Sequence, residues 1–169
     1  MNINFKSNAI FSFRPVGLTI DHSRNITLDG NILGHIVPRT TIEAGDGFVD
    51  KACGICVCSY FDPESCSDIS VTNNIVGGAD YAGFIVPGNT CGDTSEKTKN
   101  RFRDNIAHSI GGPAMGTGAL IYPDRSISSH TTCFEGSHFA AYKCKYQGAF
   151  AFYKTSKVIF HNMIMIDNA

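Results

Sequence analysis

The chain has 169 residues, 43% of them hydrophobic and 17% charged, a composition that suits one folded domain and excludes a disordered tail. Fourteen Lys and Arg balance fifteen Asp and Glu, for a formal net charge of −1, so no bulk charge draws the chain to nucleic acid or to an anionic membrane. Its longest apolar runs are far shorter than the about 20 residues that span a bilayer, so we expect neither a membrane span in this segment nor a cleaved secretory signal at its start.

Helix periodicity is scarce, whereas a short strand pattern recurs along the chain. Residues 25–34 (NITLDGNILG) match residues 68–77 (DISVTNNIVG) in type at nearly every position, with weaker echoes at 105–108 and 157–165. In residues 26–28 the first and third side chains are expected to point inwards and the middle one to solvent. Strands this short cannot bury their own faces, so the repeat predicts coils that stack on one another.

Asparagines recur where this pattern turns a corner. Asn31, Asn74 and Asn105 each directly precede an isoleucine. Asparagine tolerates left-handed φ angles and can hydrogen-bond the backbone in a turn. Stacked on successive coils, these side chains are expected to form an amide ladder.

A second motif, a short apolar strand opened by a glycine, follows at Gly83, Gly118 and Gly148. Two alternating strand motifs favour a single all-β parallel β-helix over residues 1–169 with projecting loops. Its strand repeats are expected near 24–36, 68–87, 102–122 and 146–167, with a Cys-rich loop at 50–67. The alternative is a β-sandwich or barrel, which needs more hairpin turns than the sequence offers.

Seven cysteines require an explanation. Four lie close together in residues 53–66, and three lie further along the chain. All seven are disulfide candidates: Cys53, Cys56, Cys58, Cys66, Cys91, Cys133 and Cys144. A disulfide-bonded loop fits a secreted or cell-surface protein; a zinc site formed by the clustered cysteines and a set of reduced, buried thiols remain as alternatives. The odd number leaves at least one thiol unpaired within the chain, and the pairing cannot be deduced from the sequence.

Ionisable residues near the predicted corners are the candidates for acid–base chemistry. They are Asp21, His22, Asp104 and His108. In-register stacking would place Asp29 opposite Thr72, so the next coil has no carboxylate at the equivalent position. The repeat therefore does not require the pair of carboxylates that glycoside hydrolysis uses. The competing interpretation is that the aspartates stabilise turns. The histidine spacing does not suggest a metal site, and no motif suggests a cofactor.

One tripeptide, Asn25-Ile26-Thr27, fits the acceptor pattern for N-glycosylation. The pattern is common by chance, and its use depends on secretion. Asn25 is therefore a candidate glycosylation site if the chain is extracellular.

Residues 71–91 (VTNNIVGGADYAGFIVPGNTC), followed by 104–109 (DNIAHS), resemble the parallel β-helix region of fibrocystin and fibrocystin-like proteins, the polycystic kidney and hepatic disease family. The resemblance extends from about Gly17 to the end of the sequence. It implies a right-handed parallel β-helix that is a segment of a much longer protein of the cell surface or cilium.

This resemblance and the residues together predict a non-catalytic module that is structural or binds a ligand or partner. Expected partners are other chains, or adjacent segments of the parent protein, at the open ends of the β-helix, and carbohydrate; nucleic acid is not expected. The alternative function is that of a polysaccharide-processing β-helix enzyme related to cell-surface hyaluronidases. An enzyme would bring ionisable groups together in a cleft, whereas a module would leave them dispersed.

Overall fold

A computed structural model describes residues 2–13, 16–36, 52–58, 66–92, 95, 99–112, 116–122, 132–151 and 155–169. Within these ranges the chain forms strands and turns. The described part contains no helix long and apolar enough to cross a membrane.

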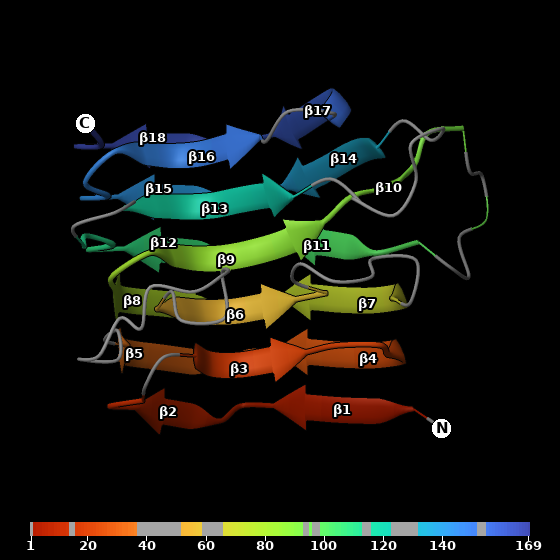
Figure 1. Ribbon diagram of the computed structural model, residues 1–169, viewed down its shortest axis with the longest axis horizontal. Helices are drawn as coiled ribbons and strands as arrows, with labels where there is room; N and C mark the ends of the chain where they lie inside the picture. The colour runs from red at the N-terminus through yellow and green to blue at the C-terminus, as the bar shows by residue number, and fades with distance from the viewer. Residues whose placement is uncertain are drawn as a thin grey trace, which may run out of the picture.

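The strands form three sheets, which the chain visits in turn (Figure 1). Sheet A contains β1 (Ile3–Lys6), β4 (Arg24–Asp29), β7 (Ser67–Thr72), β11 (Arg101–Arg103), β14 (Thr132–Ser137), β17 (Thr155–His161) and the short β10 (Asn89–Thr90). Sheet B contains β2 (Ala9–Phe11), β5 (Ile32–Ile36), β8 (Ile75–Ala79), β12 (Ile106–His108), β15 (Ala140–Tyr142) and β18 (Ile164–Ile166). Sheet C contains β3 (Val16–Ile20), β6 (Cys53–Val57), β9 (Ala82–Pro87), β13 (Thr117–Tyr122) and β16 (Gln147–Ala151).

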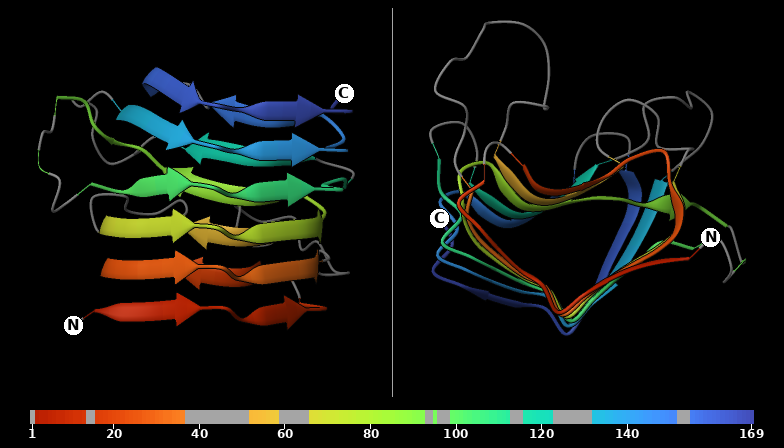
Figure 2. Two further views of the ribbon diagram at one scale, coloured as in Figure 1. Left: turned by 180° about the vertical axis from the view of Figure 1, so that it is seen from behind. Right: turned by 90° about the horizontal axis from the view of Figure 1, so that it is seen from below.

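One coil is one passage through sheets A, B and C, and coils stack in parallel along the axis of the molecule (Figure 2). Viewed along that axis, sheets A and B meet at a narrow corner, and sheet C lies across the opposite side. All strand pairs of the described residues are parallel except β10 with β14. The structure therefore confirms a parallel β-helix, and the sandwich or barrel alternative is wrong.

The register between coils confirms the repeat found in the sequence. Ile26 pairs with Ile69 and Asp29 with Thr72, so the second and third coils are offset by 43 residues, as the alignment of 25–34 with 68–77 requires.

The Cys-rich segment contains strand β6 at Cys53–Val57, so its first two cysteines lie in sheet C. Loop residues 59–65 lie outside the described part.

An amide ladder runs up the narrow corner between sheets A and B. The Oδ1 of Asn74 accepts hydrogen bonds from the backbone N–H (3.0 Å) and the Nδ2 (2.9 Å) of Asn31. Asn105 Oδ1 accepts the same two bonds from Asn74, and Asn31 Oδ1 accepts them from Asn8. The predicted ladder is confirmed, and Asn8 extends it by one coil.

The left-handed φ angle falls one residue before each ladder asparagine rather than on it. Gly30, Asn73 and Asp104 adopt φ angles of 66°, 56° and 57°. Because this preceding residue turns the chain, the asparagine itself can point inwards and bond along the stack. The ladder ends at the fully buried Phe139, which occupies the same corner one coil later.

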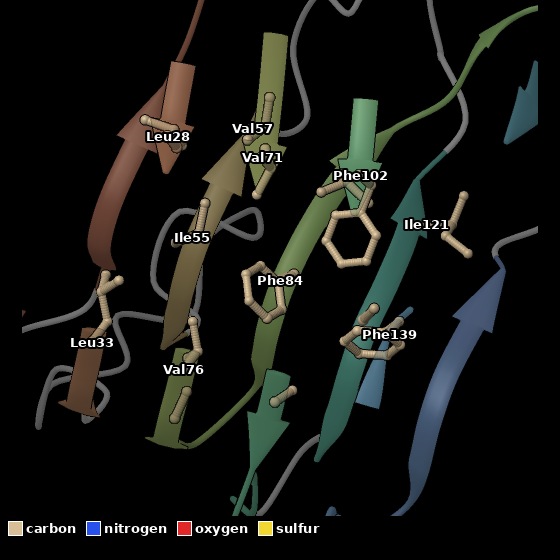
Figure 3. Packing of buried hydrophobic residues seen from close by; sticks show 14 of the residues in the cluster. Leu28, Leu33, Ile55, Val57, Val71, Val76, Phe84, Phe102, Ile121 and Phe139 are labelled. Carbon is tan, nitrogen blue, oxygen red and sulfur yellow. The ribbon is translucent and has the colours of Figure 1, made fainter. Parts of the chain in front are cut away.

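The core lies inside the three sheets and changes in character along the stack. Aliphatic side chains such as Leu28, Leu33 and Ile55 fill the second coil, whereas the rings of Phe84, Phe102 and Phe139 lie in the third, fourth and fifth coils (Figure 3). The rings of Phe84 and Phe102 meet edge to face with centroids 5.3 Å apart. Alternate side chains of sheet C form a second buried cluster that includes Cys53, Ile85 and Leu120.

A stack of glycines lies near the start of each sheet C strand. The glycines are Gly17, Gly54, Gly83, Gly118 and Gly148. A Cβ at any of these positions would approach within 3.0 Å of a sheet B side chain of the next coil. Glycine lets sheets B and C approach this closely, and its recurrence explains the motif seen at three of these positions in the sequence.

Candidate functional site

The predicted acid–base residues lie in two separate pairs and one ring stack. Asp21 and His22 follow β3, where His22 Nδ1 is 3.4 Å from Asp21 Oδ1. Asp104 lies at the corner between β11 and β12, with its Oδ1 3.5 Å from His138 Nδ1. Among the described residues, no hydrogen bond or ion pair joins the first pair to the second.

The His108 ring lies on the outer face of sheet B. It stacks on Tyr142 with ring centroids 5.1 Å apart and 8° between the planes. The Nδ1 of His108 is 3.3 Å from the hydroxyl of Ser109. The ring also covers Gly77, where a Cβ would collide with it, so His108 packs against the sheet and does not join Asp104.

Asp29 has the structural role that aspartates have in turns. Its Oδ1 accepts hydrogen bonds from the Asn73 Nδ2 (2.8 Å) and the Thr72 hydroxyl (3.0 Å). These two bonds hold the pKa of the Asp29 carboxyl below its usual value, and the nearby Lys6 lowers the pKa further. A carboxylate held ionised by its neighbours is a poor general acid.

Six of the seven cysteines form disulfides. The pairs are Cys53–Cys56, Cys58–Cys66 and Cys91–Cys133, and the buried Cys144 is the free thiol of the described residues. In the described part of the chain, no group of three or more His, Cys, Asp or Glu side chains is placed to hold a metal ion. Three disulfides are compatible with a secreted or extracellular protein.

A peptide map without reduction tests this framework. We expect three disulfides, with Cys53–Cys56 inside a single peptide, and one alkylated cysteine, Cys144, which reacts only after unfolding because it is buried and its burial raises the pKa of the thiol. Rapid alkylation of Cys53, Cys56 or Cys58 in unreduced native protein would contradict the pairing.

The glycosylation candidate Asn25 lies on β4, with a φ angle of 60°. Ile26 is buried, so its neighbours Asn25 and Thr27 lie on the outer face of sheet A, and both are partly exposed. The acceptor tripeptide therefore lies on the surface of the β-helix, and glycosylation there stays a prediction.

Sequence reasoning missed a groove on the outer face of sheet A, across the later coils. Two adjoining hollows form it, of about 230 Å³ and about 180 Å³. Lys99 and Glu135 line both. The first also has Arg101, Arg103, Ser137 and His161 in its lining, and the second has Asn89, Thr90 and Lys157.

The alternation of residues 99–103 (KNRFR) places these cations on one face. Phe102 points into the core, so Lys99, Arg101 and Arg103 point outwards. Three cationic residues at a spacing of two were the signal in the sequence for this groove.

Most charges of the groove are paired. Arg101 Nη1 lies 3.0 Å from Asp68 Oδ1, and Glu135 lies 3.7 Å from Lys99 Nζ and 3.3 Å from His161 Nε2. The side chains of Arg103 and Lys157 are exposed, and neither side chain forms a hydrogen bond or ion pair with the described residues. Each hollow therefore contains one cation that is available to a ligand.

Comparisons with known proteins returned no match to a family model, to a curated protein or to a solved structure.

Proposed function

We propose that the chain is a non-catalytic extracellular β-helix module that binds a ligand on the outer face of sheet A. The observation that carries this proposal is the composition of the groove. Among its described lining residues Glu135 is the one carboxylate, and it is already paired with Lys99 and His161. Hydrolysis of a glycoside usually requires two carboxylates that flank the bond. The dispersed positions of Asp21, His22, Asp104 and His108 agree with the same proposal.

The location at a cell or ciliary surface, as part of a fibrocystin-like protein, is the finer part of this proposal. It is supported by the resemblance of residues 71–91 and 104–109 to that family. The three disulfides support an oxidising compartment.

We further propose that the ends of the stack contact other chains or adjacent segments of a parent protein. At one end, Val158, Met163 and Met165 have exposed fractions of 37%, 43% and 37%, although the equivalent residues of inner coils are buried. At the other end, β1 and β2 each pair with one strand only. Open strand edges of this kind are suited to strand addition.

A polysaccharide-processing enzyme is the second candidate. The observation that favours it is the short contact of Glu135 Oε1 with His161 Nε2, 3.3 Å, inside the first hollow. A carboxylate and an imidazole at this distance can exchange a proton with a ligand bound above them.

Incubation with defined polysaccharides separates the two functions. Chondroitin sulfate, hyaluronan and neutral dextran of known length are mixed with the protein, and their size is followed by gel filtration. We expect the length of every polymer to stay unchanged, in the wild type and in the Glu135→Gln variant alike. Shortening by the wild type that Glu135→Gln abolishes would overturn the non-catalytic proposal.

A further inference from the structure

The two hollows of the groove form one continuous site divided by an ion pair. Lys99 and Glu135 belong to the lining of both, and their charged groups lie 3.7 Å apart. Each hollow is smaller than the about 300 Å³ at which pockets for a complete small ligand begin. The geometry therefore suits a ligand that extends from one hollow to the next.

The free cations lie at opposite ends of this site. Arg103 reaches the first hollow from β11, and Lys157 reaches the second from β17, two strands away. Arg103 pairs with Ser137 of β14, and Ser137 pairs with His161 of β17. Lys157 lies four residues before His161 on the same strand. Strand spacing and rise then place the two backbone positions about 16 Å apart. Arg103 and Lys157 thus belong to different hollows, where they can pair with two separate anionic groups of one ligand.

We propose that this groove binds an acidic polysaccharide, with one anionic group at Arg103 and another at Lys157. This inference rests on the proposed function and names its ligand class. Carboxylate or sulfate groups would pair with the two cations. The amides and hydroxyls of Asn89, Thr90 and Ser137 in the lining would bind the sugar hydroxyl groups.

Other polyanions fit this surface less well. An acidic peptide that binds by strand addition needs a sheet edge. The edge strand β17 carries Lys157, but β11, which carries Arg103, lies inside sheet A with a strand on each side, so strand addition would not bring such a peptide to both cations. Single-stranded nucleic acid binds largely by stacking its bases on aromatic rings. The two phenyl rings that line the groove, Phe102 and Phe134, are 4% and 3% exposed and belong to the core. The third ring, His161, is paired with Glu135.

The test measures the affinity of the whole 169-residue protein for a chondroitin sulfate decasaccharide by calorimetry. We expect Arg103→Ala and Lys157→Ala each to weaken binding about five- to tenfold, and the double variant to weaken it by the product of the two factors. Glu135→Gln removes the carboxylate of the groove and should strengthen binding about threefold. Lys6→Ala, which removes the same charge from the first strand of the same sheet, is the matched control and should leave the affinity unchanged.

A polyglutamate peptide and a single-stranded oligonucleotide of the same charge serve as competing probes. Absence of decasaccharide binding, equal affinity of Lys6→Ala and Arg103→Ala, or preferential binding of either competing probe would overturn the inference. The recovered decasaccharide is also sized after each titration. A shortened product with the expected variant effects would overturn the non-catalytic function alone, whereas an intact product with unchanged variant affinities would overturn the inference alone.

Discussion

Replacing Asn74 with alanine should lower the free energy of unfolding by about 4 kcal/mol. Asn74 is fully buried, and its side chain serves two neighbouring coils at once. Its Oδ1 accepts two bonds from Asn31, and its Nδ2 donates to Leu28 O (3.0 Å) and to Asn105 Oδ1 (3.1 Å). Alanine leaves the Asn31 N–H and the Leu28 carbonyl buried without their partners, and each unsatisfied group costs about 1–3 kcal/mol. Urea unfolding followed by circular dichroism measures the change.

The matched control is the preceding residue. Asn73 is exposed, adopts a φ angle of 56° and contributes a side-chain bond to Asp29. Asn73→Gly preserves the left-handed turn, so it should lower the free energy of unfolding by only about 0.5 kcal/mol, as is typical of surface changes. If Asn74→Ala costs no more than Asn73→Gly, the ladder is not a main source of stability.

The ladder also shows which parts of the fold could be predicted from the sequence. Asn31 and Asn74 each precede an isoleucine within similar stretches of sequence. This repetition indicated both the corner and the hydrogen bonds between its asparagines. Asn8 precedes an alanine, and the corner of the fifth coil contains Phe139, so the pattern does not reveal either. A corner tolerates a large apolar residue where the core on the other side can pack against it, as the rings of Phe102 and Phe160 do here.

The sequence shows the alternating cations of residues 99–103, but the complete groove could not be predicted because it depends on the register between distant strands. The cations of β11 become a site only when β14 and β17 lie beside them. Offsets between coils are 31 residues from Val71 to Phe102 and 24 residues from Phe134 to Val158. Unequal offsets leave no constant period from which Arg103 and Lys157 could have been aligned. Disulfide pairing depends on the same register, since Cys91 meets Cys133 where β10 lies beside β14.

Asp104 and His108 illustrate the opposite case, in which residues close in the sequence looked like a site and the fold gave them other partners. Asp104 and His108 are four residues apart, but Asp104 lies at the corner before β12 and His108 lies at the end of that strand. Asp104 instead meets His138 of the next coil. In a β-helix, side chains that share a row on stacked coils become neighbours, whereas residues along one coil spread over different faces.

A methyl group at the centre of the glycine stack should be nearly as damaging as the loss of the ladder. At Gly83 an added Cβ would lie 2.7 Å from the Gly118 carbonyl oxygen and 2.9 Å from the Ala107 Cβ. Both neighbours belong to the next coil, and neither can rotate away, because one is backbone and the other is a methyl group. Gly83→Ala should therefore force sheets B and C apart and lower the free energy of unfolding by about 3 kcal/mol, as overpacking a dense core does.

Gly111→Ala is the control for this change, because it adds the same methyl group on the neighbouring coil. Its Cβ would meet only the Lys145 Cβ, at the ordinary contact distance of 3.5 Å, and its φ angle is not in the left-handed region. Gly111→Ala should leave stability unchanged or raise it by up to about 1 kcal/mol, because alanine restricts the unfolded chain. Urea unfolding of both variants measures the difference, and equal stabilities would show that the coils can separate at Gly83 without cost. A large difference would mean that glycine is required there by the close approach of sheets B and C, since backbone conformation alone would accept alanine at either position.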